Sequence, residues 1–208
     1  MREVWLRGLL LFAGLFIAAG ATVARAQTDV ALSLYGAFHG TTNGNGTVQS
    51  PANSAGGMVE LRHIRNPLMG FEATYSYNRG NQTYSHEPGT GTCVVGLPCT
   101  PTTVKANAHE VTGDYLVSVH VANLRPFVLG GLGVLFNQPT SGQDATNSDT
   151  KGVFVYGAGL DWGLFPHIGL RFQYRGNLYR APDLTKLYTS TDKFTHTSQP
   201  MIGAYIRF

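Results

Sequence analysis

Hydrophobic and polar positions alternate along several short segments of this chain. From Phe71 to Asn78 the hydrophobic side chains occupy the odd positions, and from Ile168 to Arg175 they occupy the even ones. A period of two places successive side chains on opposite faces of a β-strand. After residue 26, no long stretch has the helical period of about 3.6 residues. The pattern predicts eight strands, which centre on residues 30–38, 58–62, 71–78, 110–117, 127–135, 154–162, 168–175 and 201–208.

The connections between these predicted strands alternate in length. The short ones lie near residues 65–68, 118–123 and 163–167. The long ones are rich in Gly, Thr, Ser, Asn and Pro, and they lie near residues 39–55, 79–103, 137–151 and 176–196. This rhythm predicts antiparallel hairpins, with tight turns at one end of the sheet and four long polar loops at the other.

Charged residues fall on only one face of the predicted strands. Acidic and basic side chains occur together there, and the face carries Glu60, Arg62, Glu72, Glu110, Asp114, Asp161, Arg171, Arg175 and Arg207. The opposite face is uncharged through the middle of each strand. Its aromatic residues are Phe38, Tyr75, Tyr77, Phe127, Phe154, Tyr156, Trp162, Phe172, Tyr174 and Phe208.

These two faces decide between a soluble β-sheet protein and a membrane protein. A soluble sandwich buries its apolar face, whereas a membrane barrel turns an apolar band with aromatic girdles toward lipid and encloses its polar face. An open sheet edge in lipid would leave backbone N–H and C=O groups unpaired, so the sheet must close. The sequence therefore predicts an all-β protein, an eight-stranded antiparallel up-and-down transmembrane β-barrel.

The first 26 residues have the organisation of an export signal. Arg2 and Arg7 precede an uncharged stretch rich in Leu, Phe, Ala and Ile, and Ala24-Arg25-Ala26 supplies small residues at a cleavage site. This order is typical of a cleavable signal peptide. The alternative is a membrane-anchor helix, for which the stretch is short against the roughly 20 residues of a span. We predict a signal peptide over residues 1–26, cleavage between Ala26 and Gln27, and a barrel domain over residues 27–208.

Composition narrows the class of protein further. The chain has 208 residues, of which 13% are charged and 26 are glycine, whereas about a quarter of residues are charged in an average soluble domain. A net charge of +3, without a basic run, argues against a nucleic-acid partner. Export to an oxidising compartment allows a disulfide between Cys93 and Cys99. Two free thiols are the alternative, and two cysteines are too few for a zinc ribbon.

The chain's last strand carries a resemblance to a known family. Gly203-Ala204-Tyr205-Ile206-Arg207-Phe208, together with Arg125-Pro126-Phe127-Val128, resembles the OmpA/OmpX-type eight-stranded outer-membrane β-barrel superfamily. The resemblance implies a place in the bacterial outer membrane, in contact with its lipid and lipopolysaccharide. It also implies insertion by the β-barrel assembly machinery, with Gly203, Ile206 and Phe208 as the recognised signal, and four loops that face outward and could bind an extracellular ligand.

The interior charges admit two interpretations. Eight strands enclose a lumen that side chains can fill. The predicted interior has five acidic and four basic residues, and this near balance favours a network of ion pairs that plugs the lumen, because an unpaired charge would be unfavourable to bury. The alternative is a narrow or gated path for ions or small solutes, as in OmpW-type barrels.

Catalytic and metal chemistry have weak support in this sequence. His196-x-Ser198 resembles the His-x-Ser pair of the lipid A deacylase PagL, but no Asp or Glu follows Ser198, and we expect polar residues at the rim of the barrel. The seven histidines have no metal-ligand spacing. We therefore predict no enzyme activity, no cofactor and no metal site, and expect a structural or surface-interaction role.

Overall fold

The computed structural model describes residues 27–66, 68–87, 100–140, 142–143 and 145–208. Within this part of the chain the secondary structure consists of strands and turns. No helix there has the length and apolar character needed to cross a membrane. The expected signal peptide, Ala26 and the cysteines Cys93 and Cys99 lie outside the described residues, so those expectations stay predictions.

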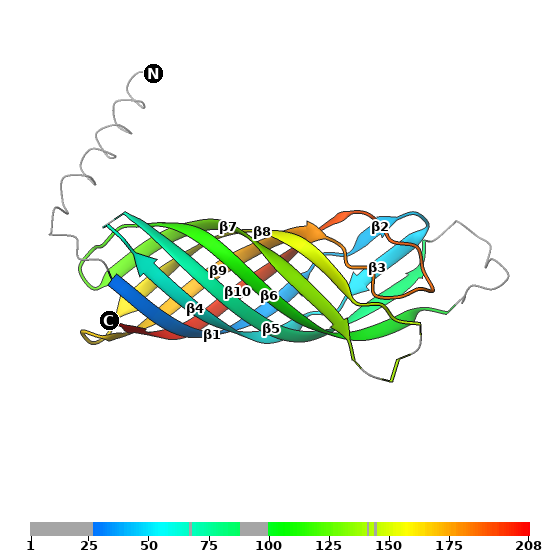
Figure 1. Cartoon of the computed structure of the whole chain (residues 1–208), viewed down its shortest axis with the longest axis horizontal. Coiled ribbons are helices and arrows are strands. Elements are labelled where there is room, and N and C mark those ends of the chain that lie inside the picture. The colour runs from blue at the N-terminus through cyan, green and yellow to red at the C-terminus, as the bar shows by residue number, and fades with distance from the viewer. Residues whose placement is uncertain (1–26, 67, 88–99, 141, 144) are drawn as a thin grey trace, which may run out of the picture.

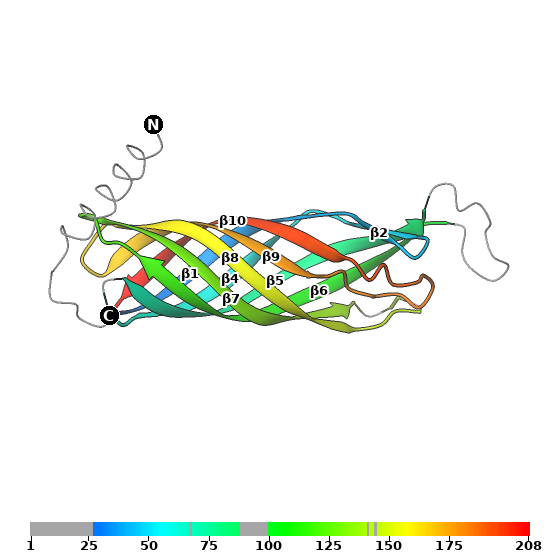
Figure 2. The ribbon, with the colours of Figure 1, turned by 90° about the horizontal axis from the view of Figure 1, so that it is seen from above.

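Eight strands form a closed antiparallel barrel (Figures 1 and 2), as predicted. Each pairs with its neighbour in the chain, and the first pairs with the last, with Tyr35 opposite Met201. The first strand begins, and the last strand ends, at the same end of the barrel (Figure 1). The strands are β1 (Gln27–His39), β4 (Ser54–Ile64), β5 (Met69–His86), β6 (Thr102–Ser118), β7 (Leu124–Pro139), β8 (Asp149–Gly163), β9 (Ile168–Arg180) and β10 (Phe194–Arg207).

A small hairpin lies in a segment that the sequence pattern predicts to be a loop. Its strands are β2 (Thr42–Gly44) and β3 (Thr47–Pro51), and β3 pairs with the far end of β5. Asn45 and Gly46 join them with φ angles of 53° and 76°, the positive values that a two-residue hairpin turn needs. The prediction of a long polar loop without strands over residues 39–55 misses this hairpin, because Asn-Gly supplies turn chemistry to polar strands that lack an apolar face.

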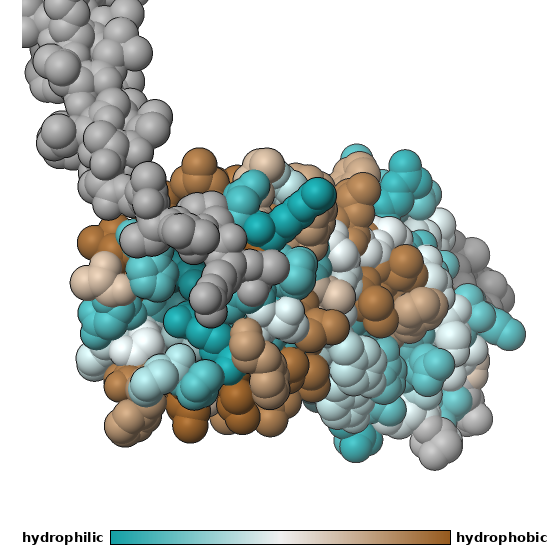
Figure 3. All heavy atoms as spheres, turned by 60° about the vertical axis from the view of Figure 1, so that its left-hand side comes forward, coloured by the Kyte–Doolittle hydropathy of each residue, from teal (hydrophilic) through white to brown (hydrophobic). Residues whose placement is uncertain are grey.

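The apolar face of the barrel wall looks outward, as the sequence predicts. Leu132 is 69% exposed and Phe172 is 40% exposed, whereas Arg171, beside Phe172 in the chain, is 0% exposed and lies in the lumen. Hydrophobic side chains gather on the outer wall of the half that holds the strand turns, and hydrophilic ones are frequent at the loop end (Figure 3). The wall therefore suits a lipid environment.

Strand β7 corrects one detail of the predicted faces. Phe127, expected among the outward aromatic residues, is 3% exposed and points into the lumen, and Leu129 and Leu135 are buried with it. The outward side chains of β7 include Val128 and Leu132. The cause is the glycine-rich sequence of this strand, in which both faces are apolar, so that hydrophobicity alone does not tell which face is inside.

A charge on the outer wall should destabilise the protein. We expect Leu132→Arg, near the middle of β7, to lower the free energy of unfolding in lipid vesicles by roughly 2–4 kcal/mol, because the guanidinium would lose its water in the hydrocarbon. Urea titration followed by tryptophan fluorescence measures this change.

Gln138→Arg is the matched control, because Gln138 is exposed on the same strand and face but lies beyond Phe136, toward the loops. We expect its effect to stay below about 1 kcal/mol. Equal effects of the two substitutions would show that the outer wall does not meet hydrocarbon at Leu132.

Candidate functional site: the charged network in the barrel lumen

Three arginines form the centre of the lumen. Arg62 on β4 and Arg171 and Arg175 on β9 are each 0% exposed. They occupy inward positions because the strand period of two alternates them with outward residues such as Phe172 and Tyr174. A buried guanidinium needs carboxylate partners that satisfy its fixed set of N–H donors.

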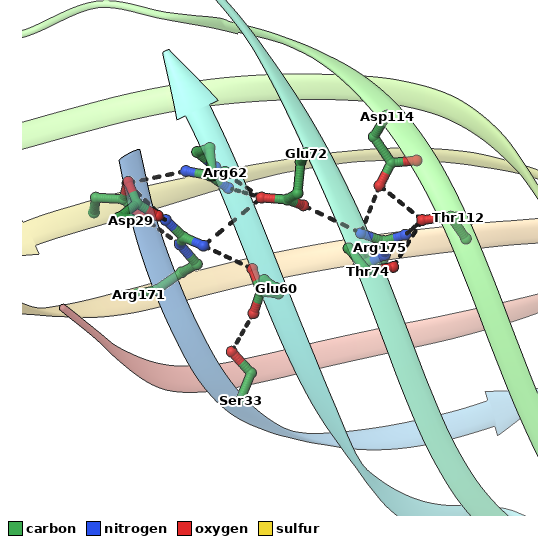
Figure 4. A network of polar contacts seen from close by, with 11 residues as sticks. Asp29, Ser33, Glu60, Arg62, Glu72, Thr74, Thr112, Asp114, Arg171 and Arg175 are labelled. Atoms are coloured by element: carbon green, nitrogen blue, oxygen red, sulfur yellow. Dashed lines mark hydrogen bonds and ion pairs between the residues drawn. The ribbon is translucent and has the colours of Figure 1, made fainter. Parts of the chain in front are cut away.

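Arg171 donates hydrogen bonds to three carboxylates from three strands. Its Nε lies 2.7 Å from Asp161 Oδ1, its Nη1 lies 2.8 Å from Glu60 Oε2, and its Nη2 lies 2.8 Å from Asp29 Oδ1. Ser33 donates a short hydrogen bond to the other oxygen of Glu60. These contacts join β1, β4, β8 and β9 across the lumen (Figure 4).

Glu72 on β5 connects the three arginines. Its Oε2 accepts a hydrogen bond of 2.7 Å from Arg62 Nε and lies 3.7 Å from Arg171 Nη1, while its Oε1 lies 3.4 Å from Arg175 Nη1. Arg62 also donates to Asp161 Oδ2 at 2.9 Å. The Glu72 carboxylate thus lies within ion-pair distance of all three guanidinium groups, and the ion pairs form one continuous network.

Arg175 extends this network to strand β6. Its Nη1 donates to Asp114 Oδ2 at 2.9 Å, and its Nη2 donates to Thr112 Oγ1 at 2.9 Å. The Thr112 hydroxyl also lies 2.7 Å from that of Thr74 on β5. The two threonine hydroxyls thus add hydrogen bonds to the ion pair of Arg175 and Asp114, although Arg175 Nε and Asp114 Oδ1 are buried without a hydrogen-bond partner among the described residues.

The two remaining strands contribute aromatic rings. The guanidinium carbon of Arg62 lies 4.1 Å from the ring centroid of Phe127 on β7, and that of Arg171 lies 5.5 Å from the ring centroid of Tyr205 on β10. Both are within cation–π range. Side chains from all eight barrel strands therefore meet in the network inside the lumen.

Seven of the nine predicted interior charges form ion pairs with one another, and two do not. Glu110 is buried and accepts a hydrogen bond of 2.7 Å from Asn177 Nδ2, but no ion pair joins it to the described residues. Arg207 is half-buried at the end of β10 and donates to Tyr205 Oη at 3.2 Å. The expectation that Glu110 and Arg207 form ion pairs within the network is therefore wrong.

The sequence pattern does not predict two of the buried charged residues in the lumen. Asp29 is 0% exposed and Arg125 is 6% exposed. Both face the lumen because side chains two positions apart lie on the same face of a strand. Asp29 lies two residues before the buried Ala31, and Arg125 lies two residues before the buried Phe127. Each lies at the start of its strand, where the alternation is too short to reveal it.

The turn end of the barrel has a basic rim. Arg125 Nη2 donates to Gln27 Oε1 at 2.7 Å, and Gln27 is the first residue of β1. Burial lowers the pKa of His120 below its usual range, and the positive charges of Arg125 and Arg207 lower it further. His120 therefore stays neutral at a pH at which a free histidine is partly charged.

His196 and Ser198 both project from the outer wall near the loop end. His196 Nε2 lies 2.9 Å from Tyr156 Oη, and Ser198 Oγ lies 3.0 Å from Tyr174 Oη. Each side chain thus shares its hydrogen bond with a tyrosine of the aromatic girdle. The two lie where a polar rim was expected.

The residues of the expected assembly signal alternate across the last strand. Ile206 and Phe208 are 52% and 75% exposed on the outside. Gly203 faces the lumen, where a Cβ atom would lie 2.1 Å from Ser33 Oγ. Glycine is thus needed there because β1 comes close, and recognition by the assembly machinery stays a prediction.

The comparisons with known proteins agree with this geometry. Residues 8–201 match the family model described as the outer membrane protein beta-barrel domain. The chain belongs to this family. Its place is accordingly the bacterial outer membrane, where the apolar wall contacts lipid. A search of curated protein sequences gives no match.

Several solved outer-membrane barrels share the fold of this family member. Neisserial surface protein A has a TM-score of 0.56 and 12% identity, with 90% of this chain and 100% of that chain covered. OprG of Pseudomonas aeruginosa has a TM-score of 0.57 and 8% identity, covering 89% and 97%. Ail of Yersinia pestis has a TM-score of 0.51 and 16% identity, covering 88% and 99%. At these identities the likeness concerns the fold alone.

Removing one cation should expose how strongly the network depends on charge balance. We expect Arg171→Met to lower the free energy of unfolding by roughly 3–5 kcal/mol, because Asp29, Glu60 and Asp161 would stay buried without their nearest cation. Urea titration in lipid vesicles, with Trp162 fluorescence as the signal, measures this loss.

Arg207→Met is the matched control, since it removes the same group from a half-buried position that has no ion pair. Its effect should be below about 1 kcal/mol. A small effect of Arg171→Met would contradict the view that ion pairs hold the lumen together.

Proposed function

We propose that this protein is a surface-interaction protein, in which the barrel is an anchor and the long connections form a binding surface. The observation that carries the proposal is a second packed core beyond the membrane-facing wall. Tyr84 on β5 and Val104 on β6 are buried there with Leu184 and Tyr188 from the 181–193 connection. A barrel that served only to anchor the chain in the membrane would not need such a core.

Hydrogen bonds that involve backbone groups join the connections to one another and to β5. Leu184 N donates to Tyr84 Oη at 3.1 Å, and Lys186 N donates to the carbonyl of Ala145 at 2.9 Å. Asn45 Nδ2, at the tip of the β2–β3 hairpin, donates to the carbonyl of Ser190 at 2.8 Å. We name this group the loop platform: the β2–β3 hairpin, the far ends of β5 and β6, and residues 181–193. Such preorganisation lowers the entropy lost on binding.

The charge of the loop platform and its surroundings suggests the chemistry of a ligand. Among the residues that the structure describes at this end, the exposed basic side chains outnumber the exposed acidic ones, and the basic ones are Arg79, Lys105, Arg180, Lys186 and Lys193. Ail of Yersinia pestis, which shares the fold, has been solved in complex with the heparin analogue sucrose octasulfate. A sulfated glycan is therefore the ligand class that we propose for this chain.

Binding of sucrose octasulfate to the purified barrel tests the proposal. We expect binding that weakens as salt is added, because exposed charges are screened. Lys186→Ala combined with Lys193→Ala should weaken it by roughly 2- to 10-fold, on the scale of one or two exposed ion pairs. Isothermal titration calorimetry in detergent measures both effects.

Arg65→Ala, at a turn on the opposite end of the barrel, is the control and should leave the affinity unchanged. The proposal fails if the glycan does not bind, or if the Lys186 and Lys193 changes have no more effect than the Arg65 change.

A narrow channel is the competing function, and the ion-paired network argues against it. Ions would have to pass the guanidinium groups of Arg62, Arg171 and Arg175, whose carboxylate partners lie within hydrogen-bond distance. We expect no stepwise conductance from the wild-type barrel in planar bilayers. Regular, repeatable conductance steps from the wild type would favour the channel instead.

A further inference from the structure

The lumen holds more acidic than basic side chains. Among the described residues, six buried carboxylates face four buried guanidinium groups, which leaves two excess negative charges if all are ionised. One of the four, Arg125, lies at the turn end and donates to the amide of Gln27. Beyond Arg175 toward the loop end, the described strands contribute no buried Lys or Arg. Negative charge is therefore in excess on the loop side of the network.

Glu110 is the one of these six carboxylates that forms no ion pair with the described residues. It is 3% exposed, and its Oε2 accepts a hydrogen bond of 2.7 Å from Asn177 Nδ2. Its Oε1 is buried and accepts no hydrogen bond from the described residues. Arg175 attracts Glu110 but lies beyond ion-pair distance. Burying an ionised carboxylate without a close positive partner is unfavourable, so the charge needs a bound cation or a proton.

A cavity lies beside Glu110, between the network and the loop end. Its volume is about 30 Å³, room for roughly two particles of the size of water. Glu110, Asn177 and Gln199 are on its wall. Asn177 Oδ1 and Gln199 Oε1 are also buried without a hydrogen-bond partner among the described residues. Since Asn177 directs its Nδ2 at Glu110, its Oδ1 is free to serve as a ligand atom.

We propose that this cavity binds one small monovalent cation of the Na⁺ or K⁺ type, with Glu110, Asn177 and Gln199 supplying oxygen ligands. Carboxylate and amide oxygens suit hard cations. A single carboxylate balances a single positive charge, whereas calcium sites in proteins usually take several carboxylates. The described residues hold no cluster of three His, Cys, Asp or Glu side chains that would suit a transition metal. This site is independent of the loop platform and goes beyond a surface role.

Thermal unfolding of the detergent-folded barrel tests the cation site. We expect NaCl or KCl to raise the unfolding midpoint by about a few degrees in a saturable way, because a ligand that binds only the folded state stabilises it. N-methyl-D-glucamine chloride at equal ionic strength should not do so, since its cation is too large. Sodium NMR gives a second readout, in which the wild-type protein should broaden the Na⁺ line.

Glu110→Gln should abolish both responses. The new amide oxygen can still accept the hydrogen bond from Asn177, so the variant is expected to fold. Asp183→Asn, the same chemical change in the 181–193 connection, is the matched control and should keep both responses. The proposal is overturned by an equal response to N-methyl-D-glucamine, by a response to Ca²⁺ alone, or by a Glu110→Gln variant that still broadens the Na⁺ line.

Discussion

An ion cannot face hydrocarbon without either water or a counter-ion, and this constraint governs the whole molecule. In a barrel wall, every second side chain must be apolar because it meets lipid. The positions between them face a lumen, where Arg62, Arg171 and Arg175 can be buried only if carboxylates surround them. The apolar wall and the ion-paired network therefore both result from the alternation of apolar and polar side chains along each strand.

The network also explains why the barrel needs all of its strands at once. Asp29 and Glu60 reach Arg171 from β1 and β4, and Asp161 reaches it from β8. These strands meet across the lumen only when the sheet has closed. The ion pairs therefore stabilise the closed barrel relative to an open sheet.

The alternation reveals the faces of most strands but not the contacts between them. It places Arg171 inside and Phe172 outside because their environments differ sharply. It fails at Phe127, where a glycine-rich strand is apolar on both faces, and at Asp29 and Arg125, which lie at strand ends. The isolation of Glu110 and the packing of Tyr84 on Leu184 depend on strand register and on folded connections, which no local pattern encodes.

The most direct test of this account is NMR of the barrel in lipid nanodiscs, with nuclear Overhauser effects measured between lipid acyl chains and protein side chains. The account predicts strong effects from acyl chains to Leu132 and Phe172 and none to Arg171, whose Nε–H should exchange slowly with water. The account would be contradicted by nuclear Overhauser effects between acyl chains and Arg171. It would also be contradicted by rapid exchange of the Arg171 Nε–H together with the absence of such effects to Leu132 and Phe172.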